Sequence, residues 1–397
     1  MREESKPAGP KSAPLLKVLL IANYVPDGQN SMQAFKEVLE RELPQHGCEV
    51  RVLAPSPRVL GHFATTSRWW KWAGYVDKFI LFLPTLASAL RWADVVHICD
   101  HSNAMYVPRV LGKPNLVTCH DVIAIQASLG MVPGWDVGRS GRLFQRLIAK
   151  GLARADLIAC VSDLTRRDLL KLRLADEAKV TTVSNGLNAA FSPMPVAEAG
   201  RLMARFGLSP RDRYLVHVGM DLPRKNRPAV LEAFIALQRR AAAAGTVPVA
   251  DKLLFVGPEL PPPLMALARE AGIEAQLLTA QQISHDELRA LYASAVALVF
   301  PSLQEGFGWP VIEAQACGCP VFTSDLAPMN EIGGEAAVYV DPHDSEKIAL
   351  AIEQAAPRLG WMRTEGLANA THYAPPQMTL NYIAAYRRAI AQRKVAA

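Results

Sequence analysis

Residues 296–313 read VALVFPSLQEGFGWPVIE, and this stretch combines the signals of a strand, a tight turn and a helix start. Val296–Phe300 is a short apolar run of the kind that is buried on both faces of a parallel sheet. Gly306 and Gly308 permit a tight turn and let bare backbone approach a ligand. Pro310 suits the first position of a helix. The stretch therefore predicts one strand–turn–helix unit of an α/β fold.

The same alternation of short β-branched runs with helical periodicity extends along the whole chain, which is the pattern of parallel βαβ units. The strand candidates before the break at Phe191-Ser-Pro-Met-Pro are Lys17–Ala22, Val50–Leu53, Val95–Ile98, Leu116–Cys119, Leu157–Val161 and Val180–Val183. Those after it are Tyr214–Val218, Leu253–Val256, Gln276–Thr279, Val296–Phe300, Val321–Thr323 and Val338–Val340. Two such runs predict two doubly wound halves that face each other, with ligands at the carboxyl ends of the strands.

Ser31 is a candidate N-cap for the helix after the first strand. One segment fits the alternating pattern less well. Residues 55–92 are long, aromatic and irregular, which suggests an elaboration of the fold. Within them Phe79–Leu90 is apolar but interrupted by Pro84, and it is too short for the ~20 residues that span a bilayer.

Composition describes a globular protein, since 50% of the 397 residues are hydrophobic and 20% are charged. A single core rarely exceeds about 250 to 300 residues, so two domains are expected. The net charge of +6 is modest and does not indicate a nucleic-acid partner. The N-terminus lacks the order of a signal peptide. We therefore expect a soluble, cytoplasmic protein.

The cysteines are scattered through apolar runs without a CxxC pair. This usage indicates buried free thiols in a reducing compartment, and neither a disulfide framework nor a zinc site. The six positions are Cys48, Cys99, Cys119, Cys160, Cys317 and Cys319.

Glu305 and Glu313 flank the glycine turn, the first before it and the second about one helical turn inside. Carboxylates accept hydrogen bonds from sugar and ribose hydroxyls, and backbone amides at a helix start favour an anion such as a diphosphate. On spacing alone, a glycine turn that caps a helix beside two surface glutamates is an equally good interpretation.

The frame PSLQEGFGWPVIEAQACGCPV, residues 301–321, closely resembles the E-x7-E signature of retaining GT-B glycosyltransferases of family 4. The similarity extends over residues 17–376 and is strongest over 215–341. It implies that Glu305 lies near the hydroxyls of the transferred sugar and that Glu313 binds the nucleotide ribose. It also places the Gly306 turn, with the backbone of Phe307 and Gly308, near the sugar and phosphates of the donor.

The segment VGMDLPRKN, residues 218–226, resembles the donor-phosphate loop of that family. Gly219 follows the strand, and the cations Arg224 and Lys225 can neutralise the charge that develops as a nucleoside diphosphate leaves. Without the resemblance, an Arg-Lys pair on a solvated loop would be the better interpretation. Met220 stands where many relatives carry arginine, so one phosphate contact can be missing.

Three further positions are assigned by the resemblance. His120, in Cys119-His120-Asp121, matches a histidine at the sugar edge, although a lone histidine is more often structural. Gly28 lies in the first strand-to-helix loop, where relatives often have two glycines. Gln282 and Ile283 lie where the base packs.

A second polar group, His97, Asp100 and His101, fits no strong metal motif, and packing explains it better. The family resemblance implies no divalent ion for this chemistry. We therefore expect no metal and no cofactor, with the nucleotide sugar as co-substrate.

Composition, the break at Phe191 and the resemblance together predict a division of the chain into four parts. Residues 1–14 are expected to be a disordered N-terminus, and 15–190 an acceptor-side Rossmann-like domain. Residues 191–375 are expected to form the nucleotide-sugar-binding Rossmann-like domain, and 376–397 a helix that packs back on the first domain.

We expect transfer of a hexose, glucose- or mannose-like, from a UDP- or GDP-sugar to a saccharide or lipid-linked acceptor, in polysaccharide or glycoconjugate biosynthesis. The resemblance implies that the anomeric configuration is retained. Two alternatives stay open: a nucleotide-sugar isomerase or hydrolase on the same fold, and a non-catalytic nucleotide-sugar-binding protein.

Two segments could contact an anionic membrane on the inner face. A set of cations recurs at helical spacing opposite Leu143, Leu147 and Ile148, and a solvated face is its bland interpretation. The cations are Arg139, Arg142, Arg146, Lys150 and Arg154. Trp69, Trp70 and Trp72 form the second segment, for which core packing is the alternative.

Overall fold

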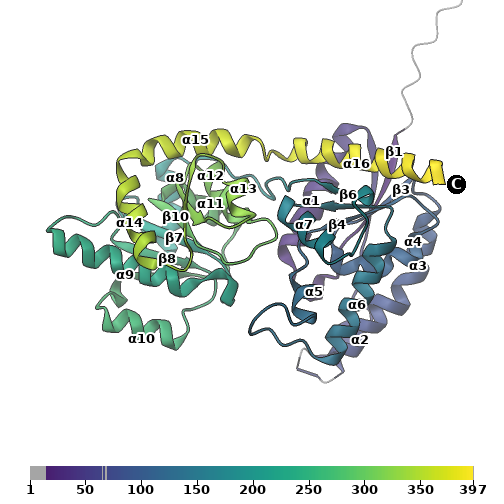
Figure 1. Cartoon of the computed structure of the whole chain (residues 1–397), viewed down its shortest axis with the longest axis horizontal. Helices are drawn as coiled ribbons and strands as arrows, with labels where there is room; N and C mark the ends of the chain where they lie inside the picture. Colours follow the sequence, from purple (N-terminus) through teal and green to yellow (C-terminus); the bar gives the residue numbers. More distant parts are fainter. Residues whose placement is uncertain (1–14, 65, 68, 397) are drawn as a thin grey trace, which may run out of the picture. The chain divides into compact units, whose positions relative to one another are not determined.

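The computed structural model describes residues 15–64, 66–67 and 69–396, and the segment 1–14 that was expected to be disordered lies outside them. The chain divides into two compact units (Figure 1). Unit 1 comprises the residues up to Thr118 together with Leu147–Ile158 and the residues from Tyr382 onward. Unit 2 comprises Cys119–Arg146 and Ala159–Asn381.

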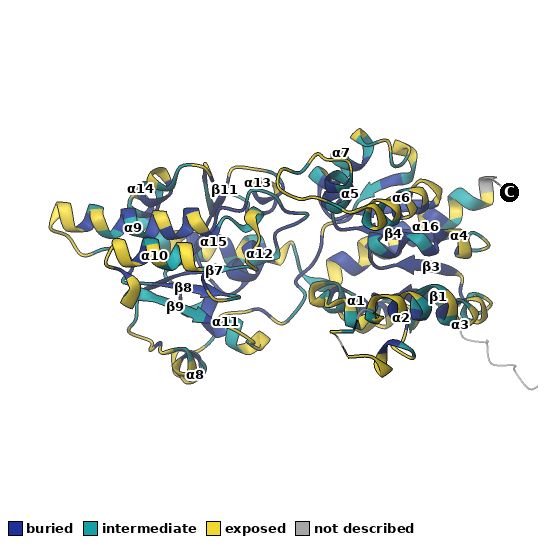
Figure 2. Ribbon diagram, turned by 90° about the horizontal axis from the view of Figure 1, so that it is seen from below, coloured by how far each residue is buried: buried dark blue, intermediate teal, exposed yellow. Residues whose placement is uncertain are grey.

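The first sheet has the strand order β2-β1-β3-β4-β5-β6. Strand β1 pairs in parallel with both β2 and β3, and β3 pairs in parallel with β4. Strand β3 is buried along its whole length, and the helices around it direct their exposed residues outward (Figure 2). The strands are β1 Leu16–Ile21, β2 Cys48–Leu53, β3 Val95–Ile98, β4 Asn115–Cys119, β5 Leu157–Cys160 and β6 Val180–Thr182.

The second sheet lies in unit 2 and has the order β12-β11-β10-β7-β8-β9, with every neighbouring pair parallel. Its central strands β7, β10 and β11 are mostly apolar and almost wholly buried, because helices cover both faces of the sheet. The strands are β7 Tyr214–Val218, β8 Lys252–Val256, β9 Leu277–Ala280, β10 Ala297–Phe300, β11 Val321–Ser324 and β12 Ala337–Val340. Both predicted runs of strands are confirmed, with ends shifted by at most two residues.

Helices follow almost every strand. The earlier ones are α1 Asn30–Glu42, α2 Trp70–Val76, α3 Phe82–Leu90, α4 Val107–Val110, α5 Ile123–Ser128, α6 Arg139–Arg154, α7 Asp163–Lys171 and α8 Val196–Met203. The later ones are α9 Arg227–Ala244, α10 Pro262–Glu270, α11 His285–Ser294, α12 Trp309–Ala316, α13 Met329–Ile332, α14 Ser345–Ala355, α15 Leu359–Thr371 and α16 Pro375–Ala396. From Tyr382 onward α16 belongs to unit 1, where Tyr386 Oη lies 2.8 Å from His97 Nδ1.

The structure corrects three local predictions. The first concerns the start of α1, and the second concerns the segment 55–92. Ser31 is not an N-cap, because α1 begins at Asn30 with Gln29 as its cap. The supposedly irregular segment contains a continuous helix of 21 residues, Trp70–Leu90, in which a π-helical turn joins α2 to α3. Such a turn inserts an extra residue without breaking the helix, and Pro84 follows it near the start of α3. By length and composition alone this helix could cross a membrane.

The third correction concerns α6. Its predicted cations are all exposed, but Leu143 and Leu147 are 59% and 44% exposed beside them, and not on an opposite, buried face. The helix packs along a narrow line through Ile148 and Leu152. Gly151 lies on this line, where a Cβ atom would come within 2.0 Å of the Ala104 carbonyl oxygen.

The prediction of free, buried thiols is confirmed, because all six cysteines are free and buried.

Candidate active site

The site lies in unit 2, at the place where its sheet changes direction. The chain leaves β7, adds β8 and β9 on one side, and then returns to place β10 on the other side of β7. Loops that follow β7 and β10 diverge at such a switch point and leave a crevice at the carboxyl ends of the strands. The two motifs that the sequence singled out are these two loops.

One backbone hydrogen bond and two from side chains join the two loops. The Leu303 amide donates to the Arg224 carbonyl oxygen over 2.7 Å, and the Ser302 hydroxyl oxygen lies 2.8 Å from the same carbonyl. Asn226, in the left-handed region at φ 55°, donates through its side-chain amide to the Pro301 carbonyl oxygen over 3.0 Å. These bonds set the distance between the cations of one loop and the carboxylate of the other.

Glu305 is the centre of the charged group. Its Oε2 lies 2.8 Å from Arg224 Nη1, and its Oε1 lies 2.6 Å from Lys225 Nζ. The Ser302 hydroxyl is also 2.6 Å from Oε1. Burial by itself would raise the pKa of Glu305, but Lys225, Arg224 and the hydrogen bonds outweigh it and hold that pKa below its ordinary value. Glu305 is therefore a buried, ionised acceptor.

This group carries an excess of positive charge, because two cations surround one carboxylate. Arg224 is also partly open to solvent, with 31% of its side chain exposed. Among the contacts of the described residues it uses Nη1, which donates to Glu305 and to the Gln304 carbonyl oxygen. Its other N–H groups remain able to donate to an anionic ligand.

Gly306 brings the turn against His120, which follows β4. A Cβ atom at residue 306 would lie 2.0 Å from the His120 carbonyl oxygen, so only glycine fits. The Gly306 carbonyl oxygen accepts from the Ser162 hydroxyl over 2.8 Å. The buried His120 ring lies 6.0 Å from the Trp309 ring. The predicted histidine and the predicted turn are therefore neighbours in unit 2.

The turn after Glu305 leads directly into α12. Gly308 has φ 98°, a conformation that disfavours any other residue, and it precedes the helix directly. Phe307 is buried and packs edge-on against Trp309, with ring centroids 5.8 Å apart. The Trp309 ring nitrogen donates to the Gly186 carbonyl oxygen over 3.0 Å. These contacts anchor the turn whose amides open the helix.

Glu313 has an environment unlike that of Glu305. It is 6% exposed, and Tyr292 donates its hydroxyl to Glu313 Oε2 over 3.2 Å. Burial raises its pKa from 4.5 to about 7, although the hydrogen bonds from Tyr292 and Asn188 oppose this. Two glutamates eight positions apart therefore differ in charge state, and Glu313 is partly protonated near neutral pH.

Of the remaining predicted residues, Gly219 borders Lys225, and Gln282, Ile283 and Gly28 lie in other loops. Gly219 follows β7, where a Cβ atom would come 3.2 Å from the Lys225 side chain. Gln282, at φ 49°, is exposed in the loop after β9, and Ile283 packs partly against the core of unit 2. Gly28 adopts φ 70° in unit 1, between β1 and α1.

Sequence reasoning missed four residues that shape the site. Ser302 and Asn226 hold the loops together as described above. His217 is buried on β7, its Nδ1 lies 2.9 Å from the Val299 carbonyl oxygen, and burial lowers its pKa to about 4, so it is neutral. Gly257 directly follows β8, and a Cβ atom there would come 2.3 Å from the Gly219 carbonyl oxygen. Their shared signal is position, since each lies at or near the carboxyl end of β7, β8 or β10.

The second polar group, His97, Asp100 and His101, lies in unit 1, and the hydrogen bonds of His97 indicate a structural role. His97 Nδ1 and Nε2 lie 2.8 Å from Tyr386 Oη and 2.7 Å from Thr118 Oγ1. Across the described ranges, no group of three or more His, Cys, Asp or Glu side chains is arranged to hold a metal ion.

The chain matches two known families of glycosyltransferases. Residues 200–356 match the family Glycosyl transferases group 1, and residues 37–191 match Glycosyltransferase Family 4. The chain is 26% identical over 327 residues to the O-antigen chain mannosyltransferase B of Escherichia coli. This alignment covers 79% of this chain and 83% of that protein. It is 29% identical over 245 residues to a D-inositol 3-phosphate glycosyltransferase of a Mycobacterium species, of which it spans about half, 53%.

Two solved structures show the same fold. A sucrose-phosphate synthase from Thermosynechococcus elongatus aligns with a TM-score of 0.68 at 19% identity, over 95% of this chain and 99% of that one. Anabaena Alr3699/HepE, in complex with UDP and glucose, aligns with a TM-score of 0.68 at 13% identity, over 93% and 99%.

Proposed function

Because this chain belongs to the GT-B glycosyltransferases of family 4, we propose that it transfers a glucose- or mannose-like hexose from a UDP- or GDP-sugar to a saccharide or lipid-linked acceptor, with retention of the anomeric configuration. The product would be part of a polysaccharide or glycoconjugate. One observation carries the proposal: at the β7/β10 switch point, Arg224 and Lys225 converge on the buried carboxylate of Glu305.

The donor would bind with its diphosphate at the two cations. Arg224 and Lys225 supply one more positive charge than Glu305 neutralises, and a diphosphate at a helix start would also meet the amides after Gly308. The sugar hydroxyls would donate to Glu305, which is ionised and has lone pairs to offer. Glu313 would accept from the ribose hydroxyls.

The transfer step follows from this placement. The bond between the anomeric carbon and the diphosphate oxygen breaks, and the acceptor oxygen bonds to the same face of the sugar. The departing diphosphate takes the acceptor proton. Arg224 and Lys225 stabilise the negative charge that grows on the leaving group. Since these cations supply the charge that a metal would supply, we propose that the reaction needs no metal or other cofactor.

A panel of UDP-, GDP-, ADP- and TDP-sugars in thermal-shift assays tests donor binding. A ligand at about 100 times its Kd stabilises a protein by about 2.7 kcal/mol, which is a readily measured shift. If no nucleotide sugar raises the melting temperature, the proposed donor site is wrong.

Proton NMR of the product then tests the stereochemistry and the alternatives. Retention at the anomeric carbon is expected, and inversion would exclude the proposed route. Turnover without an acceptor would instead favour a hydrolase or isomerase on the same fold. Donor binding without any turnover would favour a binding protein.

We further propose that the protein works in the cytoplasm in peripheral contact with an anionic membrane, where a lipid-linked acceptor would be available. The exposed cations of α6 and the exposed tryptophans near α2 are the features that suggest it.

A further inference from the structure

The helix Trp70–Leu90 in unit 1 presents apolar side chains to solvent. Trp72 is 64% exposed and Ile80 is 61% exposed, with Trp69 and Tyr75 beside them at 53% and 38%. Only 28% of its most apolar 18-residue stretch is buried. A helix on the surface of a water-soluble protein normally directs its polar face outward. Because this helix directs apolar side chains toward solvent instead, its exposed face suits a partner that accepts apolar groups.

The opposite side of the helix packs against the rest of unit 1. Asp77 is buried and accepts from the Tyr24 hydroxyl and the Val59 amide, each over 2.8 Å. The Phe82 ring packs on the Tyr106 ring, with centroids 5.1 Å apart. A membrane-spanning position would pull Phe82 out of this core and carry Asp77 into hydrocarbon, which is costly. The helix can therefore lie on a membrane surface but not cross it.

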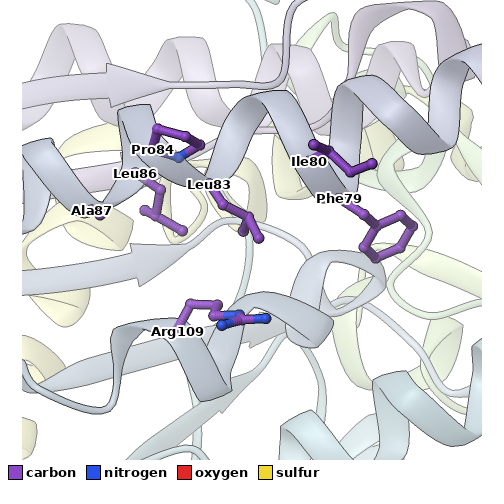
Figure 3. Close-up of a pocket in the computed structure, with 7 residues that line it drawn as sticks. All are labelled: Phe79, Ile80, Leu83, Pro84, Leu86, Ala87 and Arg109. Carbon is purple, nitrogen blue, oxygen red and sulfur yellow. The ribbon is translucent and has the colours of Figure 1, made fainter.

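A pocket opens along this helix (Figure 3). It has a volume of about 440 Å³, within the range of ligand pockets. Six of its lining residues come from the helix, and the seventh, Arg109, comes from α4 on the facing side. The six are Phe79, Ile80, Leu83, Pro84, Leu86 and Ala87. An apolar pocket with one cation at its edge fits a hydrocarbon chain that carries an anionic group.

The charges around the pocket favour the same ligand. Arg109 is exposed and forms no ion pair with any described residue. Lys71 and Arg91, near the two ends of the helix, are exposed cations. The acidic residue of the segment 70–91 is Asp77, which is buried. Tryptophans favour the boundary between headgroups and acyl chains.

We propose that this surface binds an anionic membrane phospholipid, with an acyl chain in the pocket, the phosphate at Arg109, and Trp72 and Ile80 in the headgroup boundary. This site rests on the proposed membrane contact and names its ligand. It is separate from the donor chemistry, because it lies in unit 1, whereas Glu305, Glu313, Arg224 and Lys225 lie in unit 2. It can therefore be tested separately from transfer.

Vesicle flotation at low salt tests the site, with phosphatidylcholine vesicles that contain or lack phosphatidylglycerol. The wild-type protein is expected to float with the anionic vesicles and far less with the neutral ones. I80E and W72E should each lower the partition coefficient by about tenfold or more. R109Q should reduce the preference for phosphatidylglycerol. V247E, at a residue 73% exposed in unit 2, should float like the wild type.

Donor thermal shifts should be the same for all four variants, which shows that each is folded and separates this test from the donor site. The proposal fails if the wild type floats with neither vesicle, or if I80E and W72E float as well as it does. It also fails if R146E, on α6, abolishes flotation while I80E does not. If light scattering shows that I80E splits a dimer and flotation is unchanged, the surface pairs two copies of the chain and the lipid site is wrong.

Discussion

Replacement of Glu313 by glutamine should change how stability depends on pH. The carboxyl is 6% exposed, and burial raises its pKa from 4.5 to about 7 in the folded protein. In the unfolded chain it should ionise near its ordinary value. Between these two pH values the folded protein therefore keeps a proton that the unfolded chain has lost.

The sign and size of the effect follow from this difference. Below about pH 4.5 the carboxyl is protonated in both states, and its contribution to stability is fully present. As the pH rises from about 4.5 to about 7, the free energy of unfolding falls by about 1.4 kcal/mol for each pH unit, and above this range the fall levels off. With the pKa at about 7, the loss reaches on the order of 3 kcal/mol. Glutamine resembles the protonated acid, so Glu313→Gln removes this loss.

Urea unfolding, followed by tryptophan fluorescence, measures the effect at about pH 5 and about pH 8. The variant should match the wild type within about 1 kcal/mol at the lower pH. At the higher pH it should be more stable by on the order of 3 kcal/mol. Glu270→Gln, at an exposed position on α10, is the matched control and should show no such divergence. If the wild-type and Glu313→Gln curves stay parallel across this range, Glu313 titrates normally and its burial does not act as described.

Three other changes test the site, and one tests the core. Glu305→Gln should lower turnover by about 100-fold or more without unfolding the protein, because the sugar hydroxyls lose their ionised acceptor and Arg224 and Lys225 lose the carboxylate that positions them; full activity in initial-rate assays would exclude Glu305 from the mechanism. Gly306→Ala should destabilise the protein by about 1–3 kcal/mol, since the new Cβ meets the His120 carbonyl oxygen, and an unchanged melting temperature would contradict this. EDTA should leave the transfer rate unchanged, and a loss that Mg²⁺ or Mn²⁺ restores would show a metal requirement. The six buried thiols should react with Ellman's reagent only after denaturation, and rapid labelling of the native protein would show that a thiol is accessible.

The strands of both units could be predicted because their signal is local. A strand covered on both faces by helices is mostly apolar, and the sequence shows a short, mainly apolar run at each strand position. The glycine turn before α12 is local too, since its left-handed Gly308 and its Pro310 are specified by their own backbone preferences. The helix Trp70–Leu90 was missed, because a π-helical turn and exposed apolar residues do not follow the 3.6-residue pattern of a water-soluble helix.

The sequence by itself determined the residue types of the donor site, namely two carboxylates around a glycine turn and a pair of cations on a separate loop. Only the tertiary structure decided that Arg224 meets Glu305 across 81 positions of sequence, because strand order makes β10 a neighbour of β7. It also decided that Glu305 is ionised while Glu313 holds its proton more tightly. A pKa depends on burial and on nearby charges, and both are set by residues distant in the chain.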